Sequence, residues 1–224
     1  MSDNFVVKRW QRLKYLKALN MVEANPTKVV LDLGCGSGSL LRLLSRVFDD
    51  VIGLEIDPGY LTSIASSHIP NITLLNSDGR KLPFRTESID TIYSIGVLEH
   101  ISRVQECIIE AHRVLRKGGS FIIGLPIESG VASIFKSIIH KLVNYDTEEK
   151  ISIVAALKSF SAGSKTERKY YYHVGKDSQL GHIGFRWEDL LNLVRKYFRV
   201  GKLTLFPFNS LRTINPYVFL KLVK

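Results

Sequence analysis

The chain has 224 residues, of which 45% are hydrophobic and 23% are charged, and its formal net charge is +10. That length and composition are ordinary for one globular domain with a large core. No apolar run reaches the roughly 18 residues of a membrane span, and the start of the chain lacks the apolar core of a signal peptide, so we expect a cytoplasmic protein. Cys35 and Cys107 are the only cysteines, which argues against a disulfide framework and against a cysteine-based zinc site.

The positive charge is uneven along the chain. Residues 51–126 carry seven Lys and Arg against eight Asp and Glu, whereas residues 181–224 carry eight against two. A basic surface of this kind attracts nucleic acid, anionic lipid or a phosphorylated substrate, and it also promotes solubility alone. The charge pattern therefore leaves the partner open.

The first predicted element is an amphipathic helix over residues 5–24. Its apolar residues recur at every third position, its lysines and arginines occupy the other faces, and Asn25-Pro26 ends it. We expect residues 1–25 to form a cap over the edge of a sheet or over a ligand cleft. The apolar positions are Trp10, Leu13, Leu16, Leu19 and Val22.

The stretch from Val29 to Leu40, V-V-L-D-L-G-C-G-S-G-S-L, is the most informative part of the sequence. Its apolar start predicts a buried parallel strand. Its glycines predict a turn that lets a ligand approach the backbone closely before the next helix begins. Further on, Glu55 ends a second apolar strand, where an acid can accept hydrogen bonds from ribose hydroxyls. Together these features predict a site for a cofactor that contains a nucleoside.

The spacing of the glycines indicates which cofactor. A dinucleotide site requires G-x-G-x-x-G/A, but Ser39 stands at the third small position, and the spacing is G-x-G-x-G after Asp32. This arrangement resembles motif I of the class I S-adenosylmethionine-dependent methyltransferases, in which an acid two positions before the first glycine belongs to the pattern. The resemblance implies that S-adenosylmethionine contacts Asp32, Gly34, Cys35, Gly36, Gly38, Glu55 and Ile56.

A regular alternation of helices and strands follows this loop. Leucines from Leu40 onward predict a helix that ends at Asp49-Asp50, and Pro58 lies near the start of a second helix. The apolar face of that second helix comprises Leu61, Ile64 and Ala65. Residues 72–75 are predicted to form the third strand. The alternation predicts a doubly wound sheet whose ligands lie beyond the carboxyl ends of the strands.

Two later segments extend the resemblance. Asp78-Gly79, followed by Leu-Pro-Phe, is similar to the methyltransferase element whose acid bonds the adenine amino group. The fourth strand, Ser88 to Ile95, with the Leu-Glu-His after it, is similar to the corresponding piece of many small-molecule members. Gly118-Gly119 is predicted to form the tight turn into a fifth strand, although Lys117 replaces the family's usual proline. The resemblance adds Asp78, Gly79, Ser94 and Ile95 to the cofactor site.

The end of the chain departs from the simple alternation. Residues 127–180 predict a helical insertion after the fifth strand, where family members build a substrate pocket or lid. Residues 181–224 predict a helix and a terminal antiparallel hairpin, with residues 215–217 as the turn before the last strand. The predicted fold is therefore α/β: a Rossmann-like, doubly wound and mostly parallel seven-stranded sheet. Its core spans residues 26–126 and is completed by residues 181–224.

The predicted chemistry needs few catalytic groups. Methyl transfer from a sulfonium is an in-line displacement, so positioning supplies much of the rate. A nucleophile that enters with a proton requires a base. The candidates are His100, after the fourth strand, and His182, after the insertion, together with His173 and the tyrosines beside it, because histidine titrates near neutral pH. The histidines are scattered and show no ligand spacing, so we expect no metal.

The function expected from these features is methyl transfer from S-adenosylmethionine to an oxygen or nitrogen of a small or lipid-linked acceptor. One alternative is an RNA or protein methyltransferase that docks through the basic ends, and another is a peripheral membrane contact through an amphipathic helix at residues 131–143. A cofactor-binding partner subunit without activity is a further alternative. A nicotinamide oxidoreductase is disfavoured by Ser39. The acceptor and the oligomeric state stay open.

Overall fold

The computed structural model describes residues 5–67, 69–127, 186–208 and 215–224. Nearly all of the insertion predicted for residues 127–180 lies outside these ranges, as do His173 and His182.

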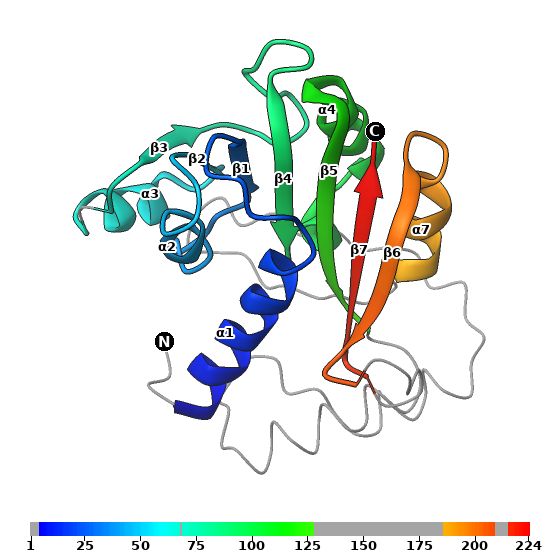
Figure 1. Ribbon diagram of the computed structural model, residues 1–224, viewed down its shortest axis with the longest axis horizontal. Coiled ribbons are helices and arrows are strands. Elements are labelled where there is room, and N and C mark those ends of the chain that lie inside the picture. The colour runs from blue at the N-terminus through cyan, green and yellow to red at the C-terminus, as the bar shows by residue number, and fades with distance from the viewer. Residues whose placement is uncertain (1–4, 68, 128–185, 209–214) are drawn as a thin grey trace.

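The centre of the molecule is a seven-stranded sheet in the order β3-β2-β1-β4-β5-β7-β6 (Figure 1). Strand β7 is antiparallel to β5 and β6, and the pairs from β3 to β5 are parallel. The predicted mostly parallel sheet with an antiparallel C-terminal hairpin is therefore confirmed. The strands are β1 (Val29–Leu33), β2 (Asp50–Glu55), β3 (Ile72–Asn76), β4 (Ile89–Ile95), β5 (Leu115–Pro126), β6 (Arg199–Phe206) and β7 (Tyr217–Val223).

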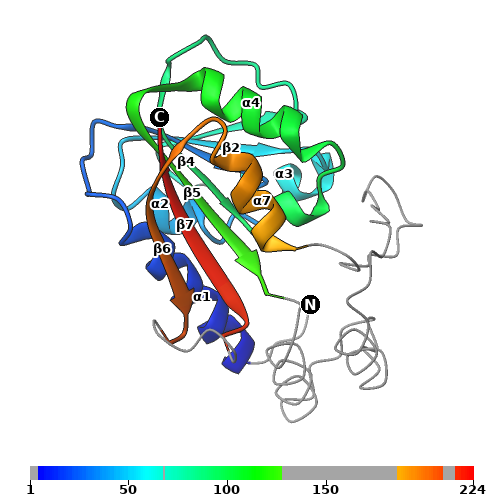
Figure 2. The same cartoon turned by 90° about the vertical axis from the view of Figure 1, so that its right-hand side faces the viewer.

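Helices cover both faces of this sheet (Figures 1 and 2). One apolar cluster joins the sheet to α1 (Phe5–Leu19), α2 (Leu41–Leu44) and α3 (Pro58–Ala65). The other cluster joins it to α4 (Val104–Val114) and α7 (Trp187–Val194). Because successive side chains of a strand point to opposite faces, the strands need apolar residues at almost every position, as the continuous apolar runs of the sequence predict.

The packing of α1 differs from the predicted apolar line. Leu13 is 44% exposed, whereas Ala18 and Met21 are 0% and 6% exposed. A residue every third position turns by about 300° around a helix, so a strict three-residue line drifts off any one face within a few turns. Three residues of the predicted line, Trp10, Leu19 and Val22, do pack against the core, and the ring centroid of Trp10 is 4.8 Å from that of Phe206.

Three other local predictions were wrong. Helix α2 is a single turn, because the chain beyond Leu44 continues in tighter turns such as the bond from the Val47 amide to the Leu44 carbonyl. Ala65 is exposed, and Ile64 alone of α3 is buried. The double glycine lies inside β5: Gly118 donates its amide to the Lys224 carbonyl, and the strand bulges there between its pairs with β4.

Gly53, in the middle of β2, gives a test of this packing. An added Cβ would lie 2.6 Å from Leu41 Cδ1 and 3.2 Å from Cys35 Sγ, both of which are buried. We expect Gly53→Ala to lower the free energy of unfolding by about 1–3 kcal/mol because the core cannot accommodate another methyl group. Gly79→Ala is the matched control, since its Cβ meets nothing closer than 3.4 Å. Equal stability of the two variants in urea denaturation would contradict the packing argument.

Candidate functional site

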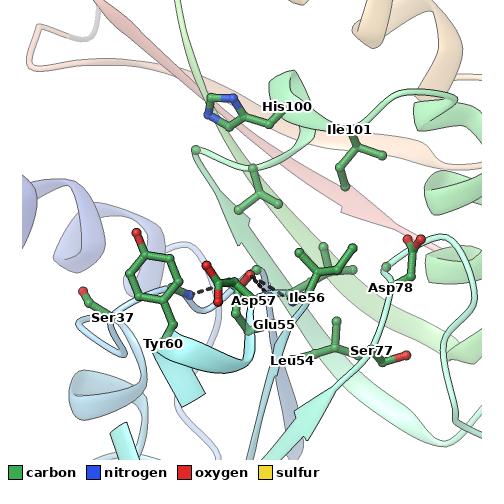
Figure 3. Close-up of a pocket in the computed structure, with 16 residues that line it drawn as sticks. Ser37, Leu54, Glu55, Ile56, Asp57, Tyr60, Ser77, Asp78, His100 and Ile101 are labelled. Atoms are coloured by element: carbon green, nitrogen blue, oxygen red, sulfur yellow. Dashed lines mark hydrogen bonds between the residues drawn. The ribbon is translucent and has the colours of Figure 1, made fainter. Parts of the chain in front are cut away.

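A pocket opens at the carboxyl edge of the sheet, where the predicted ligand loops meet. Its walls come from the loop after β1, from the end of β2 with the start of α3, from the turn after β3, and from the loop after β4. Figure 3 shows the side chains that line it. The switch in strand order between β1 and β4 brings these four segments together, because the chain leaves β1 toward β2 and leaves β3 toward β4.

The glycine loop is held against its neighbours by its backbone. The amides of Gly34 and Cys35 donate to the Leu54 carbonyl over 2.8 and 3.1 Å. Gly34 has φ of +77°, and a Cβ there would lie 2.5 Å from Val97 Cγ1. Glycine is therefore required at this position both by backbone conformation and by the close approach of the loop after β4.

The carboxylate of Glu55 is held in the pocket by three backbone amides. Its carboxylate accepts from the Gly36 amide at 2.8 Å through one oxygen, and from the amides of Ile56 and Asp57 at 2.9 and 3.2 Å through the other (Figure 3). A carboxylate offers about four lone-pair positions. One position therefore remains to accept from a ligand, and the side chain that presents it is fixed by the backbone.

Asp32 lies beneath the glycine loop and is 3% exposed. One of its carboxyl oxygens, Oδ2, has no hydrogen-bond partner among the described residues. Burial, with a further contribution from the charge of Glu55, raises the pKa of Asp32 to about 8. A buried acid in this condition is stabilised by a cation or a hydrogen-bond donor that reaches it.

Asp78 forms an ion pair that the sequence did not indicate. The Arg80 guanidinium donates to it from Nε at 2.9 and 3.0 Å and from Nη2, and the Arg80 amide adds a bond of 2.9 Å. These hydrogen bonds, together with the charge of Arg80, hold the pKa of Asp78 below its usual range. Asp78 is therefore ionised, but Arg80 uses most of its lone pairs. No pattern in the sequence marks Arg80 for this role.

His100 lies across the pocket from Glu55 and Tyr60 (Figure 3). It ends the short 3₁₀ turn Leu98–His100, and its amide donates to the Val97 carbonyl at 2.9 Å. The other predicted base, His182, is outside the described ranges. Within those ranges no group of three His, Cys, Asp or Glu side chains is placed to hold a metal ion.

The predicted cofactor residues fall into two groups. Those that line the pocket, with His100, are Gly34, Gly36, Glu55, Ile56, Asp78 and Gly79. Asp32, Cys35, Gly38, Ser94 and Ile95 do not line it. Cys35 is 7% exposed and packs in the core beside α2, and burial raises the pKa of its thiol. The turn of the loop thus places Gly34 and Gly36 at the pocket and Cys35 in the core, and a motif match alone does not reveal this division.

The pocket also contains residues that the sequence analysis did not select. Asp57 caps α3 by accepting from the Gly59 amide at 2.8 Å, and Tyr60 follows in the first turn of that helix. Asp57-Pro58 is recognisable in the sequence as the start of a helix. Because that helix directly follows a strand that ends at the ligand site, this pair could have marked Asp57 and Tyr60 as pocket residues. Ser37, Ser77, Val97 and Ile101 also line the pocket, with no comparable signal.

The pocket and the outer surface differ in charge. The lining contains three carboxylates, Glu55, Asp57 and Asp78, and among the described residues that line it there is no lysine or arginine. The chain as a whole carries a net charge of +10. A pocket of this kind favours a positively charged ligand, and it disfavours a pyrophosphate.

The described residues contain no helix long and apolar enough to cross a membrane.

Comparison with known proteins gives consistent results. Residues 31–123 match the family model described as a methyltransferase domain. The 18S rRNA (guanine(1575)-N(7))-methyltransferase of Saccharomyces cerevisiae is 29% identical over 119 residues, which are 48% of this chain and 43% of that protein. The demethylmenaquinone methyltransferase of Tropheryma whipplei is 32% identical over 118 residues, 51% of this chain and 46% of that protein. The chain thus spans less than half of the length of these two relatives.

Solved structures agree on the fold. An S-adenosylmethionine-dependent methyltransferase from Mesorhizobium loti superposes with a TM-score of 0.63 at 15% identity, over 94% of this chain and 97% of that one. The segment that matches the family model, residues 31–123, begins within β1 and ends within β5. It therefore contains the glycine loop, Glu55, Asp78 and His100. Residues 31–123 therefore match the methyltransferase domain family, the chain has the fold of S-adenosylmethionine-dependent methyltransferases, and the two findings together imply S-adenosylmethionine as the cofactor.

Proposed function

We propose that the chain transfers the methyl group of S-adenosylmethionine to an oxygen or nitrogen of a small or lipid-linked acceptor. The observation that carries this proposal is the acidic pocket, in which Glu55 is fixed by three backbone amides beside the glycine loop. S-adenosylmethionine is a cation that carries an ammonium and a ribose, and both need acceptors. The pocket supplies such acceptors, and none of the described residues that line it is a lysine or an arginine, although Arg80 reaches Asp78 from outside the lining.

We assign three carboxylates to the cofactor. Glu55 has a lone-pair position left for a ribose hydroxyl, and Asp78 lies at the end of β3, where it can accept from the adenine amino group if Arg80 shares its oxygens. Asp32, with its unpartnered Oδ2, matches the ammonium of the methionine part. The orphaned buried oxygen supports the assignment, because a buried acid without a partner is costly unless a ligand completes it.

S-adenosylmethionine supplies, when bound, a methyl group that is already activated by the sulfonium charge. The chain's part is to hold the acceptor in line with that group and to keep water away. Leu33, Val97 and Ile101 give the pocket an apolar wall toward β4. We assign His100, on the same wall, as a group that can take a proton from the acceptor. Residues 127–180 are proposed as the lid over the acceptor.

The cofactor assignment is tested by calorimetric titration with S-adenosylmethionine, S-adenosylhomocysteine and NAD in parallel. We expect the first two to bind and NAD not to bind. Glu55→Ala should weaken S-adenosylhomocysteine binding by about 1–3 kcal/mol, because it removes an ordered acceptor from the ribose and releases three amides. Glu106→Ala is the control, since Glu106 pairs with Arg103 on the exposed side of α4. NAD binding alone, or unchanged affinity in Glu55→Ala, would contradict the assignment.

The buried Asp32 gives a prediction in which the size of a stability change depends on pH. Its folded-state pKa of about 8 lies above the ordinary value of 3.8, so ionisation costs stability as the pH rises from about 4 toward 8. Asp32→Asn should therefore raise the free energy of unfolding at pH 8 by ~1 kcal/mol or more and should leave it almost unchanged at pH 4. The same variant should bind S-adenosylhomocysteine more weakly. Thermal denaturation at the two pH values, with calorimetry, measures both effects.

A second candidate acceptor is RNA. Lys8, Arg9 and Arg12 are exposed on α1, and one relative is named for the 18S rRNA that it methylates. If RNA docks on α1, reversal of these three charges should weaken binding of a structured RNA. The reversal should also flatten the salt dependence by about one unit of log–log slope for each phosphate that the variant no longer neutralises.

Filter binding at several salt concentrations measures that slope. Lys81, Arg85 and Lys117 are also exposed but lie on other segments, and their reversal is the matched control. An equal loss of affinity in both triple variants would show only a general charge effect and would count against docking on α1.

A further inference from the structure

Three cations gather on one face of the antiparallel part of the sheet. Arg199 and Lys202 lie on β6 and are exposed, and Lys221 lies on β7 and is half-buried. The register places Lys202 directly opposite Lys221, and it places Arg199 opposite Val223, two positions further along β7. Cross-strand partners point to the same face of a sheet, as do positions two apart on one strand. The three side chains therefore leave the sheet on one side, and we call this group the basic face.

A β-bulge in β6 brings Lys202 to the basic face. The pairing with β7 shifts between Val200 and Lys202, which makes Gly201 the extra residue. Strict alternation would instead put Lys202 on the side of Val200, which packs against the apolar cluster of α4 and α7. Bulges commonly re-aim a side chain in this way. The bulge thus places the two cations of β6 on one side of the strand.

The basic face continues the side of the sheet on which α1 packs. The contacts of α1 with this side include those of Lys14 with Tyr217 and of Trp10 with Phe206. Lys221 is four residues further along β7 than Tyr217, and it lies beyond these contacts. In Figure 1 no described helix lies in front of the upper parts of β7 and β6, and Figure 2 shows α4 and α7 on the opposite side.

The charge of the basic face is not balanced by acids beside it. Strands β5, β6 and β7 contain no aspartate and no glutamate. The Lys224 ammonium, just beyond β7, does pair with Glu87. Arg199, Lys202 and Lys221 form no ion pair with any described residue. The basic face therefore presents a local excess of positive charge.

Two lysines directly opposite each other are an unfavourable arrangement. The Cβ atoms of such a pair lie about 4.5–5.5 Å apart, and like charges at this distance destabilise a sheet. Lysine on an edge strand such as β6 can prevent pairing with another sheet. That role does not explain Lys221, because β7 is paired on both sides. An anion bound between the two ammonium groups offsets their repulsion, so the pair indicates an anionic partner.

The surroundings of the basic face favour a nucleic acid over a lipid surface. Peripheral membrane binding uses apolar side chains that enter the bilayer beside the cations. Among the described residues, no large exposed apolar side chain lies on β5, β6 or β7. These side chains are Leu13, Ile56, Tyr60, Ile109 and Phe208. The phosphate backbone of a nucleic acid, by contrast, binds to cations and hydrogen-bond donors alone.

We propose that the basic face binds the phosphate backbone of RNA. The inference rests on the second candidate acceptor of the proposed function and gives it a docking surface. The Tyr217 hydroxyl lies 3.5 Å from the position of a Cβ on Gly96, which lines the pocket. Four residues separate Tyr217 from Lys221, so the basic face begins about 13 Å from this point along β7. An RNA longer than this distance can contact the basic face and the pocket together.

The test is filter binding of a labelled RNA hairpin to the full chain at several salt concentrations. We expect the affinity of the wild type to fall steeply as the salt concentration rises. The triple variant Arg199→Gln, Lys202→Gln, Lys221→Gln should bind about tenfold or more weakly at low salt. Its log–log slope should be flatter by about one unit for each phosphate contact that is lost.

A matched control removes the same charge from other segments of the chain. The triple variant Arg46→Gln, Lys81→Gln, Arg85→Gln changes three exposed cations outside β6 and β7. It should keep the slope of the wild type, because a general effect of net charge does not remove a phosphate contact. An equal loss of affinity and of slope in the two triple variants would overturn the proposal.

Lys202→Glu separates docking from folding. It replaces the like-charged pair with Lys221 by a pair of opposite charges, so the midpoint of urea unfolding should not fall. The RNA affinity should fall nevertheless, because the new carboxylate repels phosphate. A lower midpoint together with the lost affinity would show that the variant acts through folding, and this result would overturn the proposal.

Two further outcomes would overturn the proposal. One is that the wild type does not bind the RNA hairpin at low salt, and the other is that it binds vesicles of phosphatidylserine and phosphatidylcholine instead. S-adenosylhomocysteine binding is measured on every variant and should not change, since the three cations do not line the pocket. Failure of S-adenosylhomocysteine to bind the wild type would count against the proposed methyl transfer, whereas loss of RNA docking alone would count against the basic face.

Discussion

The carboxylate of Glu55 is the interaction on which the site depends. By accepting from Gly36 on one side and from Ile56 and Asp57 on the other, it ties the glycine loop to the start of α3. Loops at the edge of a sheet are ordinarily its most variable parts. Here the loop's own amides are used to orient an acid, and the acid in turn holds the loop in the conformation that glycine at position 34 permits. The Glu55 carboxylate therefore contributes both to the shape of the pocket, by holding the loop, and to its negative charge.

The contrast between a basic exterior and an acidic interior follows from the same arrangement. The carboxylates collect at the carboxyl ends of β1, β2 and β3, because parallel strands bring those ends to one edge. Asp32 is the extreme case, since it is buried with an unpartnered oxygen and an elevated pKa. An isolated protein would be more stable without that acid. A cation or a hydrogen-bond donor that reached Asp32 would offset this cost, as we propose for the cofactor, and function and stability would then oppose each other at Asp32.

The sequence was sufficient for the succession of strands and helices along the chain and for the ends of the ligand strands, because these depend on apolar runs and on glycine, which act locally. Glu55 and Asp78 could be placed from their positions at strand ends. The burial of Cys35 could not, because it depends on how the turn rotates, and neither could the pairing of Arg80 with Asp78, because an exposed-looking arginine two residues away carries no periodic signal. Within the predicted apolar line of α1, Leu13 alone is exposed, and the reason is geometric, because a three-residue spacing drifts around a helix.

Helix α1 lies close to two of the buried polar groups, although it comes before residues 31–123, which match the family model. It brings Lys14 over the ring of Tyr217, and it brings Tyr15 close enough to Asp32 that burial and the aspartate charge raise the pKa of Tyr15 to about 12. The helix thus places polar side chains next to two buried groups, Asp32 and Tyr217. Apolar packing of a surface helix does not by itself account for the inward position of Lys14 and Tyr15. No residue of α1 is among the described residues that line the pocket, so the helix reaches the site only indirectly, through Tyr15 near Asp32, and its exposed basic side faces solvent.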